Sequence, residues 1–165
     1  MAEKDLKGLF LHQLKDTYYA EGAIIKALGK MGEAAQSEEL RGAFGVHAQE
    51  SREQVKRLDQ VFKLLGEKPE GIQCKAIEGI IAEGDEVLEE FGGEDANDAA
   101  LISAAQAIEH YEITRYGTLL AWAKQLDMDE AANLLKETLV EEVNTDEILS
   151  ELAEDAINPA AAEAA

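Results

Sequence analysis

The chain has 165 residues, a length that suits one domain with a core large enough to fold alone. With only 2 prolines and 5% aromatic residues, its composition favours long helices over sheets. The 35 acidic residues against 15 basic ones give a net charge of -20, which repels phosphate backbones and anionic lipids. We therefore expect neither nucleic acid nor a membrane surface as a partner, and we expect most of the charge to form solvated helix faces.

Targeting and redox signals point to the cytoplasm. The N-terminal stretch MAEKDLKGLFLHQLKDTYYAE is charged throughout, unlike a signal peptide, and no apolar run has the length of a membrane span. Cys74 is the single cysteine, which excludes an internal disulfide framework and a cysteine-rich zinc site. We expect a cytoplasmic protein in which Cys74 is a small buried hydrophobic residue.

The first three helices are predicted from hydrophobic residues that recur with a period of 3.6. One helix covers about residues 5–31. The next covers about 37–65, where Ser37 is an expected N-cap and the sequence GEKPEG ends the helix. A shorter helix is expected over about residues 74–90.

Two long helices are predicted after the turn GGEDAND. The first is capped by Asn97 or Asp98 and ends near residue 126, and the second follows DMDE and ends near residue 152. Asn158 and Pro159 together read as a helix stop. We therefore expect a bundle over residues 1–153 and a short, frayed Ala/Glu-rich tail over 154–165.

The connections between the predicted helices define the fold class. Short turns join the first two long helices and the last two, so each pair is expected to form an antiparallel hairpin. The connection between the pairs contains the shorter helix. Two hairpins with a long crossover are typical of an all-α, ferritin-like four-helix bundle.

Charged residues interrupt the apolar stripes of these helices. Glu21, Glu112 and Glu142 fall at interior positions, and Glu50 lies at the edge of its stripe. A weak repeat relates them, because Glu21 precedes Glu112 by 91 residues and Glu50 precedes Glu142 by 92. Two hairpins related by a pseudo-twofold axis would place these acids at one level of the bundle. Buried carboxylates are costly unless a counter-charge is present, so the pattern predicts a dinuclear metal site.

Three more candidate ligands lie one helical turn from these glutamates. His47 and Glu109 each stand three residues before one of them, and Asp146 stands four residues after one. A set rich in oxygen with one or two imidazoles suits iron or manganese better than structural zinc.

The same residues also fit roles that involve no metal. Arg115, one turn after Glu112, is a possible ion-pair partner for a buried carboxylate, and Gln54 is a second polar partner. His47 taken alone is more typical of a satisfied core or interface histidine than of a metal ligand. His110 lies nearly opposite Glu112 on its helix, so we expect it to contact the 74–90 helix or a partner chain.

Four stretches resemble the YciF/YciE family of bacterial stress-associated proteins: LFLHQLKDTYYAE, AIEGIIAEGDEVLEE, AAQAIEHYEITRYGTLLAWAKQL and LLKETLVEEVNTDEIL. The resemblance covers about residues 5–153. It implies a ferritin-like arrangement of five helices, dimers and a dinuclear metal site. On this resemblance Glu21 and Glu112 match the single glutamates of two core helices, and Glu50 and Glu142 match those that open Glu-x-x-His motifs.

The histidines of those motifs are missing, because Glu53 and Thr145 occupy their places. Two functions follow as hypotheses. The first is a metal-binding, oxidoreductase-like or iron-handling protein in which Glu50 and Glu142 bridge the metals; no segment specifies a storage cage. The second is a non-enzymatic stress protein that acts through dimerisation or protein contacts, with a degenerate metal site.

Overall fold

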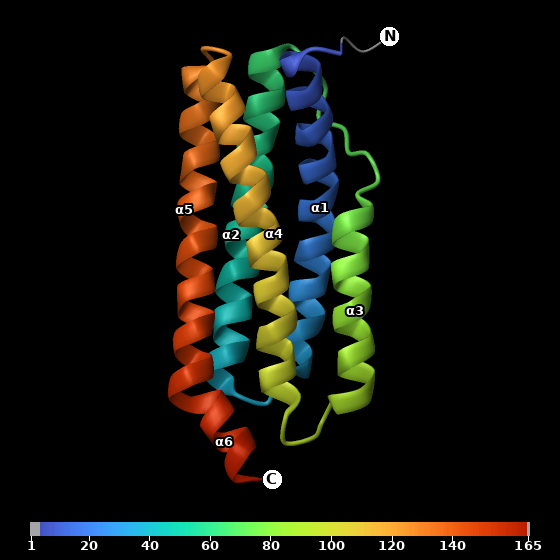
Figure 1. Cartoon of the computed structure of the whole chain (residues 1–165), viewed down its shortest axis with the longest axis vertical. Coiled ribbons are helices and arrows are strands. Elements are labelled where there is room, and N and C mark those ends of the chain that lie inside the picture. The colour runs from blue at the N-terminus through green and yellow to red at the C-terminus, as the bar shows by residue number, and fades with distance from the viewer. Residues whose placement is uncertain (1–3, 165) are drawn as a thin grey trace.

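The computed structural model describes residues 4–164, and all the regular structure in that range is helical. Four long helices are α1 (Leu6–Ala34), α2 (Glu38–Leu65), α4 (Asn97–Gln125) and α5 (Asp129–Leu152). They form an antiparallel bundle, and the shorter α3 (Lys75–Phe91) lies in the crossover, where it packs on α1 and α4 (Figure 1). The predicted all-α four-helix bundle with a fifth helix in the crossover is confirmed.

The boundaries of α2 follow the predicted signals. The side chain of Ser37 accepts a hydrogen bond from the backbone N–H of Leu40, as an N-cap does. Gly66 ends the helix with a φ of 70°, a left-handed conformation that glycine adopts without the steric cost of a Cβ. The sequence therefore located both ends of this helix.

The start of α4 differs from the prediction. Asn97 and Asp98 do not cap the helix; they lie in its first turn and hold the α1–α2 turn instead. The carboxylate of Asp98 accepts hydrogen bonds from the backbone N–H groups of Gln36 and Ser37, at 2.9 and 2.7 Å. Asn97 Nδ2 donates to the carbonyl oxygen of Ala34 at 3.0 Å. Tertiary contacts thus use both side chains to join the two hairpins.

The chain also remains helical beyond α5. A π-helical turn, η1 (Ala153–Ile157), leads into the short α6 (Asn158–Glu163), so the predicted stop at Asn158 and Pro159 is wrong. Pro159 falls in the first turn of α6, where its missing N–H group has no role in helix bonding. The division into a bundle and a frayed tail stays a prediction.

The core has two hydrophobic clusters separated by a polar level. One cluster contains Ile24, Phe44, Leu101, Ile108 and Leu149. The other contains Phe10, Leu14, Leu58, Phe62, Tyr116 and Leu135. Each of the four long helices contributes to both clusters, and between its two contributions it carries buried polar residues. This level crosses the middle of the bundle and contains the predicted site.

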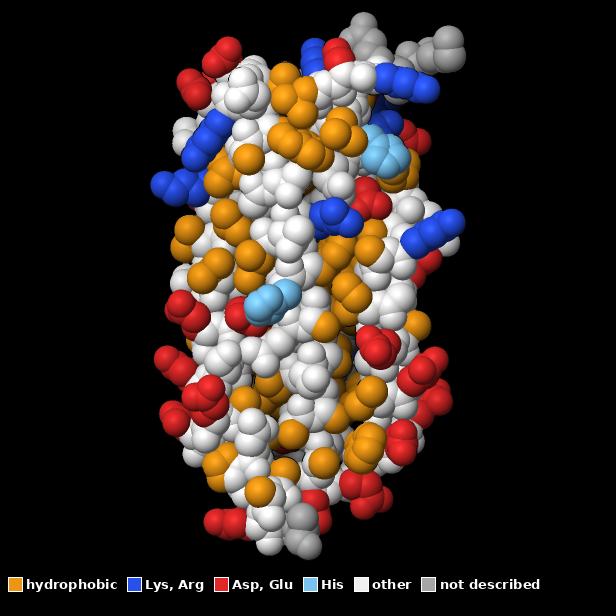
Figure 2. All heavy atoms as spheres, viewed as in Figure 1, with side chains coloured by type: hydrophobic (Ala, Val, Ile, Leu, Met, Phe, Trp, Pro, Cys, Tyr) orange, Lys and Arg blue, Asp and Glu red, His pale blue; other side chains and the backbone are white. Residues whose placement is uncertain are grey.

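The outer surface carries most of the charge. Figure 2 shows, on one face, basic side chains gathered toward the end where the N-terminus lies, and acidic side chains toward the other end. Within residues 4–164, no helix combines the length and the apolar character that a membrane span requires.

Candidate metal centre

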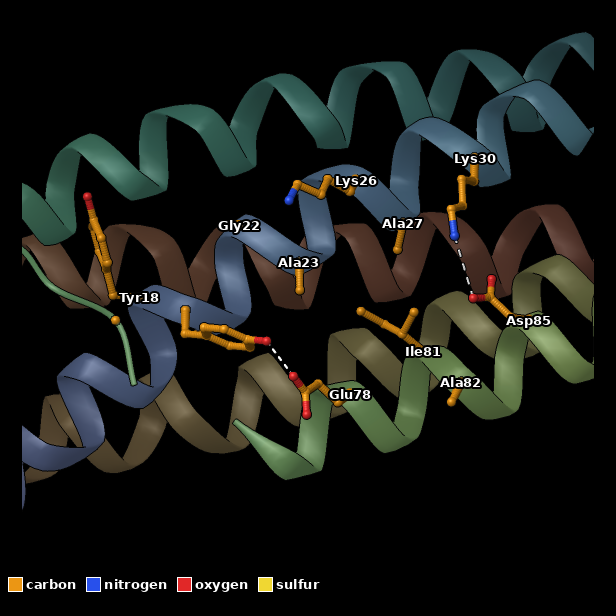
Figure 3. Close-up of a pocket in the computed structure, with 12 residues that line it drawn as sticks. Tyr18, Gly22, Ala23, Lys26, Ala27, Lys30, Glu78, Ile81, Ala82 and Asp85 are labelled. Atoms are coloured by element: carbon orange, nitrogen blue, oxygen red, sulfur yellow. Dashed lines mark hydrogen bonds and ion pairs between the residues drawn. The ribbon is translucent and has the colours of Figure 1, made fainter. Parts of the chain in front are cut away.

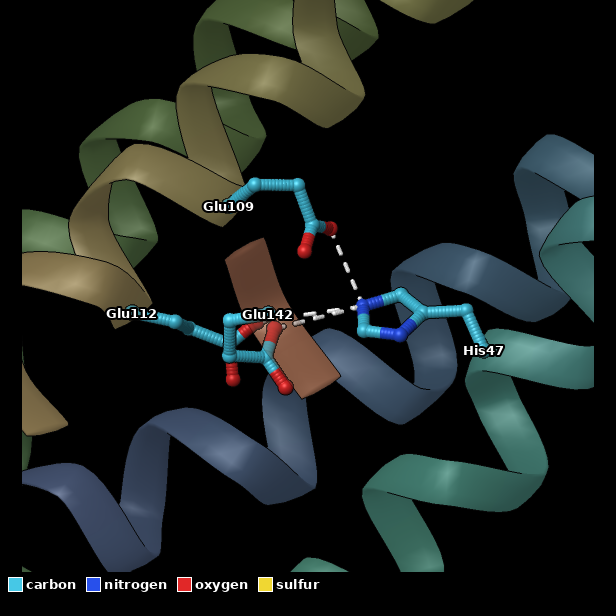
Figure 4. A group of neighbouring side chains, drawn as sticks. All are labelled: His47, Glu109, Glu112 and Glu142. Atoms are coloured by element: carbon cyan, nitrogen blue, oxygen red, sulfur yellow. Dashed lines mark ion pairs between the residues drawn. The ribbon is translucent and has the colours of Figure 1, made fainter. Parts of the chain in front are cut away.

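Four buried side chains meet in the polar level. They are His47 from α2, Glu109 and Glu112 from α4, and Glu142 from α5, and one ligand atom from each lies within 4.8 Å of the others. Figure 4 shows the three glutamates extending toward the ring of His47. The His47 Nε2 atom lies 3.0 Å from Glu109, 3.9 Å from Glu112 and 3.7 Å from Glu142. We call these four residues the His47 cluster.

Most polar atoms of the His47 cluster have no hydrogen-bond partner among the described residues. These atoms are His47 Nε2, both carboxylate oxygens of Glu109 and of Glu112, and Glu142 Oε2. The 3.0 Å contact between His47 and Glu109 is close, but it is not aligned as a hydrogen bond. An unpartnered buried polar atom costs roughly 1–3 kcal/mol, so native proteins seldom keep several together. One cation would satisfy many of them at once.

Glu21 lies at the edge of this group. The hydroxyl of Tyr116 donates a hydrogen bond to Glu21 Oε1, while Oε2 is buried and has no hydrogen-bond partner within residues 4–164. Glu21 and Glu112 are close enough for each to shift the pKa of the other. The repeat-related pair therefore does converge, as the sequence predicted, although Glu21 is partly engaged by Tyr116.

The pKa values of the buried side chains indicate which groups in the polar level are protonated when no metal is bound. Burial raises the pKa of Glu21 to about 7 and those of Glu112 and Glu142 well above the ordinary range. Burial also disfavours the imidazolium form of His47, yet Glu109, Glu50 and Glu142 outweigh it and raise its pKa to about 11. The metal-free level thus holds protons that a bound cation would displace.

Hydrogen bonds from α2 hold Glu142 in place. Gln54 Nε2 donates to Glu142 Oε1 and, at 3.0 Å, to Glu141 Oε2. Arg57 binds both oxygens of Glu141, at 2.6 and 2.7 Å. Gln54 was already a sequence candidate for contact with a buried acid, but nothing in the helical pattern indicated Arg57 and Glu141, which lie at partly exposed positions.

Arg115, the other sequence candidate for pairing with a buried acid, lies elsewhere. Its guanidinium carbon is 5.1 Å from the centre of the Tyr111 ring, and its Nε has no hydrogen-bond partner among the described residues. Cation–π contact therefore accounts for its position better than an ion pair with Glu112.

Besides Glu21 at its edge, two predicted ligands lie outside the His47 cluster. The Glu50 side chain is 37% exposed, and its Oε2 is 3.6 Å from His47 Nδ1, on the solvent side of the ring. Asp146 accepts a hydrogen bond from Gln106 Nε2 at 3.2 Å and lies 3.1 Å from His110 Nε2. The His110 ring thus faces α5 and not the 74–90 helix, so the first expected contact is wrong, and the alternative, a contact with a partner chain, stays a prediction.

A one-residue difference in register explains the position of Glu50. The buried residues of α2 and α5 are related by a spacing of 91, the same spacing that relates Glu21 to Glu112. At that spacing the counterpart of Glu142 is Ser51, which is fully buried and donates to the carbonyl oxygen of His47 at 3.0 Å. Ser51 thus occupies the place of a fourth glutamate. Applying one spacing to both hairpins would have revealed this from the sequence.

The residues of the His47 cluster fit a transition metal. Three carboxylates and one imidazole are hard and borderline ligands, a set that suits iron or manganese. With Glu21 at the edge, the oxygen atoms suffice for two ions. The predicted ligand roles and the identity of the metal stay predictions.

Comparisons with known proteins give the same fold. The chain is 45% identical over 159 residues to "Protein YciF" of Escherichia coli strain K12, covering 96% of both chains. It superposes on the crystal structure of the E. coli stress protein YciF with a TM-score of 0.89 and 44% identity, covering 94% of this chain and 99% of that one. YcfI from Rhodopseudomonas palustris matches with a TM-score of 0.87 and 46% identity, covering 89% of this chain and 94% of that one.

A more distant structure, protein XCC3681 from Xanthomonas campestris, shares the fold at 20% identity with a TM-score of 0.75, over 96% of both chains. The family model described as "Domain of unknown function (DUF892)" matches residues 5–162, nearly the whole described range. The resemblance to YciF noted in the sequence is confirmed, and the chain belongs to the DUF892 family.

Proposed function

We propose that this protein binds a dinuclear centre of iron or manganese in the middle of its bundle. His47, Glu109, Glu112 and Glu142 would hold the metals, and Glu21 would complete the set on the α1 side. The single observation that carries the proposal is the group of unpartnered, buried ligand atoms that three helices bring within 4.8 Å. A purely structural core gains nothing from such an arrangement, because apolar residues of similar size would avoid its cost.

The proposed role is the handling of iron, oxygen or peroxide during stress. A bound iron or manganese pair would supply one-electron redox chemistry and Lewis acidity. The description of the similar E. coli protein as a stress protein supports this role. The small access to the cluster, described below, restricts any reactant to a few atoms.

The protein's own residues would hold the ligands in place and move protons. Glu112, Glu142 and Glu21 would release their protons as metal binds, because a cation replaces the proton as counter-charge. Gln54 would fix Glu142 through its amide, and Tyr116 would fix Glu21 through its hydroxyl.

A second function is contact with other protein chains, including the expected homodimer. It is supported by exposed apolar side chains on the outer face of α5, Val140 and Val143. Such contacts are compatible with metal binding, and on their own they do not explain the buried acids.

The metal content of protein purified without chelator tests the proposal. After dialysis against Fe²⁺ under argon or against Mn²⁺, we expect about two ions per chain in the native protein. Glu142→Gln should lose most of this metal, because it removes a buried ligand. Asp146→Asn is the matched control, since it removes an acid one turn along α5 that lies outside the His47 cluster. Native protein without stoichiometric metal, or equal loss in both variants, would contradict the proposal.

A further inference from the structure

A cavity between α2 and α5 leads from the surface to the His47 cluster. Its volume is about 160 Å³, and both His47 and Glu109 line it. At the outer end stand Val46 and Ile148, whose side chains are 62% and 49% exposed. Two residues of its wall, His47 and Glu109, thus belong to the cluster, and each has a buried atom without a hydrogen-bond partner among the described residues, His47 Nε2 and Glu109 Oε1.

The size of this cavity limits what it admits. A water molecule occupies about 30 Å³ in the liquid, so the space has room for about five. Sites for organic ligands usually have about 300–1,000 Å³, which excludes a substrate of that size. The cavity is therefore suited to ions and to molecules of two or three atoms.

Glu50 gives the cavity its charge. It lines the wall, is exposed to solvent over 37% of its side chain, and approaches His47 Nδ1 to 3.6 Å. The other wall residues are mainly small or apolar, including Ala43 and Leu149. Glu50 is the solvent-exposed carboxylate of the wall, while Glu109 is fully buried, and low-dielectric walls concentrate the negative potential of an acidic protein at this opening.

The larger groove between α1 and α3 offers a contrast (Figure 3). Its side chains are occupied by contacts with one another, such as the Tyr19–Glu78 hydrogen bond and the Lys30–Asp85 ion pair at 3.6 Å. Lys26 adds a second cation to its wall. Among the described residues that line this groove, none belongs to the His47 cluster. Because the groove has no connection to the His47 cluster within the described residues, it is unsuitable for delivering a cation there.

We infer that the cavity between α2 and α5 is the route by which divalent cations enter the His47 cluster, and that Glu50 captures them at its mouth. Glu50 is then an entry residue: it binds the arriving ion for a short time and passes it to His47 and Glu109, one side-chain length further in. This inference rests on the proposed function, because it assumes that the cluster takes up metal. It explains why Glu50 is half-exposed beside a buried ligand set.

The test measures the rate and the affinity of Co²⁺ uptake separately. Metal-free protein is mixed with Co²⁺ in a stopped-flow instrument, and visible absorption follows the replacement of water ligands. Glu50→Gln should slow uptake about tenfold, the scale of electrostatic attraction at a charged opening, and leave the equilibrium Kd within about threefold of native. Added salt should reduce the difference between the two proteins, because it screens the charge of Glu50.

A second variant tests the route itself. Ala43→Phe places a large ring in the cavity and should slow uptake by at least tenfold at unchanged stoichiometry. Ala82→Phe is its control, since Ala82 lines the groove of Figure 3, and it should leave the rate unchanged.

The outcomes separate this inference from the proposed function. If native protein takes up no Co²⁺, both are wrong. If it takes up Co²⁺ and both Glu50→Gln and Ala43→Phe keep the native rate, the entry route is wrong and metal binding stands. If Glu50→Gln weakens the Kd as much as Glu142→Gln does, Glu50 is a ligand and its role as an entry residue is wrong. Glu50→Gln changes neither size nor helix propensity much, so it remains informative should Ala43→Phe fail to fold.

Discussion

The two hairpins of the bundle share one pattern of burial but contribute differently to the His47 cluster. The α4–α5 hairpin supplies Glu109, Glu112 and Glu142. The α1–α2 hairpin supplies His47 to the cluster and Glu21 at its edge, and it has Ser51 at the place that corresponds to Glu142. The acidic ligands are thus concentrated on one hairpin, and the other contributes the imidazole. Hairpins with related burial can thus hold different donor sets, because the residue types differ at corresponding positions: Ser51 and Glu142, His47 and Thr138, Tyr18 and Glu109.

Restoring the missing acid should have the largest effect. Ser51→Glu would make the two hairpins more alike by adding a carboxylate to a fully buried position. Without metal, we expect the free energy of unfolding to fall by about 3–5 kcal/mol at pH 8, the cost of an unpaired buried charge. Urea unfolding with and without Mn²⁺ measures it, and Mn²⁺ should recover part of the loss.

Ser51→Ala provides the comparison for that variant. It removes only the hydroxyl, whose hydrogen bond to the His47 carbonyl group is worth about 1 kcal/mol. A loss in Ser51→Ala equal to that in Ser51→Glu would mean that the hydroxyl, and not the added charge, decides stability at this position.

The pH dependence of stability should be the next largest effect. Glu21, Glu112 and Glu142 have raised pKa values, so the folded metal-free protein keeps protons that the unfolded chain has released above about pH 4.5. The raised pKa of His47 acts in the same direction above pH 6.5. Stability should therefore fall between pH 5 and pH 8, by about 2–3 kcal/mol from Glu21 alone, and the other three groups should add to the fall. Urea unfolding at several pH values checks the sign.

Metal should reverse this dependence, because deprotonated ligands bind cations more tightly as pH rises. Stability that increases from pH 5 to pH 8 in metal-free protein would contradict the assigned charges of the polar level.

Removing one acid from the richer hairpin should stabilise the metal-free protein. Glu112→Gln replaces a buried carboxylate, which has two unpartnered oxygens, with a neutral group of the same shape. We expect the free energy of unfolding to rise by about 1–3 kcal/mol at pH 8 and metal binding to weaken. Thermal unfolding at pH 8 and pH 5 measures it, and the gain should shrink at pH 5, where Glu112 is protonated. If Glu112→Gln lowers the free energy of unfolding at both pH values, the buried carboxylate of Glu112 does not destabilise the metal-free protein.

The sequence predicted the bundle better than it predicted the site. Helix period, Ser37 and the Gly66 turn located the long elements, because these signals are local. Glu21, Glu112 and Glu142 were found because an acid in an apolar stripe is conspicuous. Glu50 is assigned to the site from the sequence because it is an acid at the edge of its stripe, whereas the interior position one residue later holds Ser51, which carries no charge. The Asp146 side chain is oriented by residues of α4, and Arg57 of α2 binds Glu141 of α5. Both arrangements depend on how helices pack, so no local sequence pattern specifies them.

The smallest effect concerns the outer support of the richer hairpin. Arg57→Lys should keep the positive charge but lose one of the two hydrogen bonds that hold the Glu141 carboxylate. Glu141 would then hold the side chain of Gln54 less firmly, because Gln54 donates a hydrogen bond to it. We expect a stability change below about 1 kcal/mol, because Arg57 is partly exposed, and a loss of metal affinity of up to about tenfold, as for other groups that orient ligands. Isothermal titration with Mn²⁺ measures the affinity. Lys56→Ala is the control, because Lys56 pairs with Glu53 on the outside of the same helix, and it should leave the affinity unchanged. If the two variants bind Mn²⁺ with the same affinity, the hydrogen bonds that join Arg57, Glu141 and Gln54 to Glu142 do not affect metal binding. The difference between the hairpins would then concern only the residues of the His47 cluster.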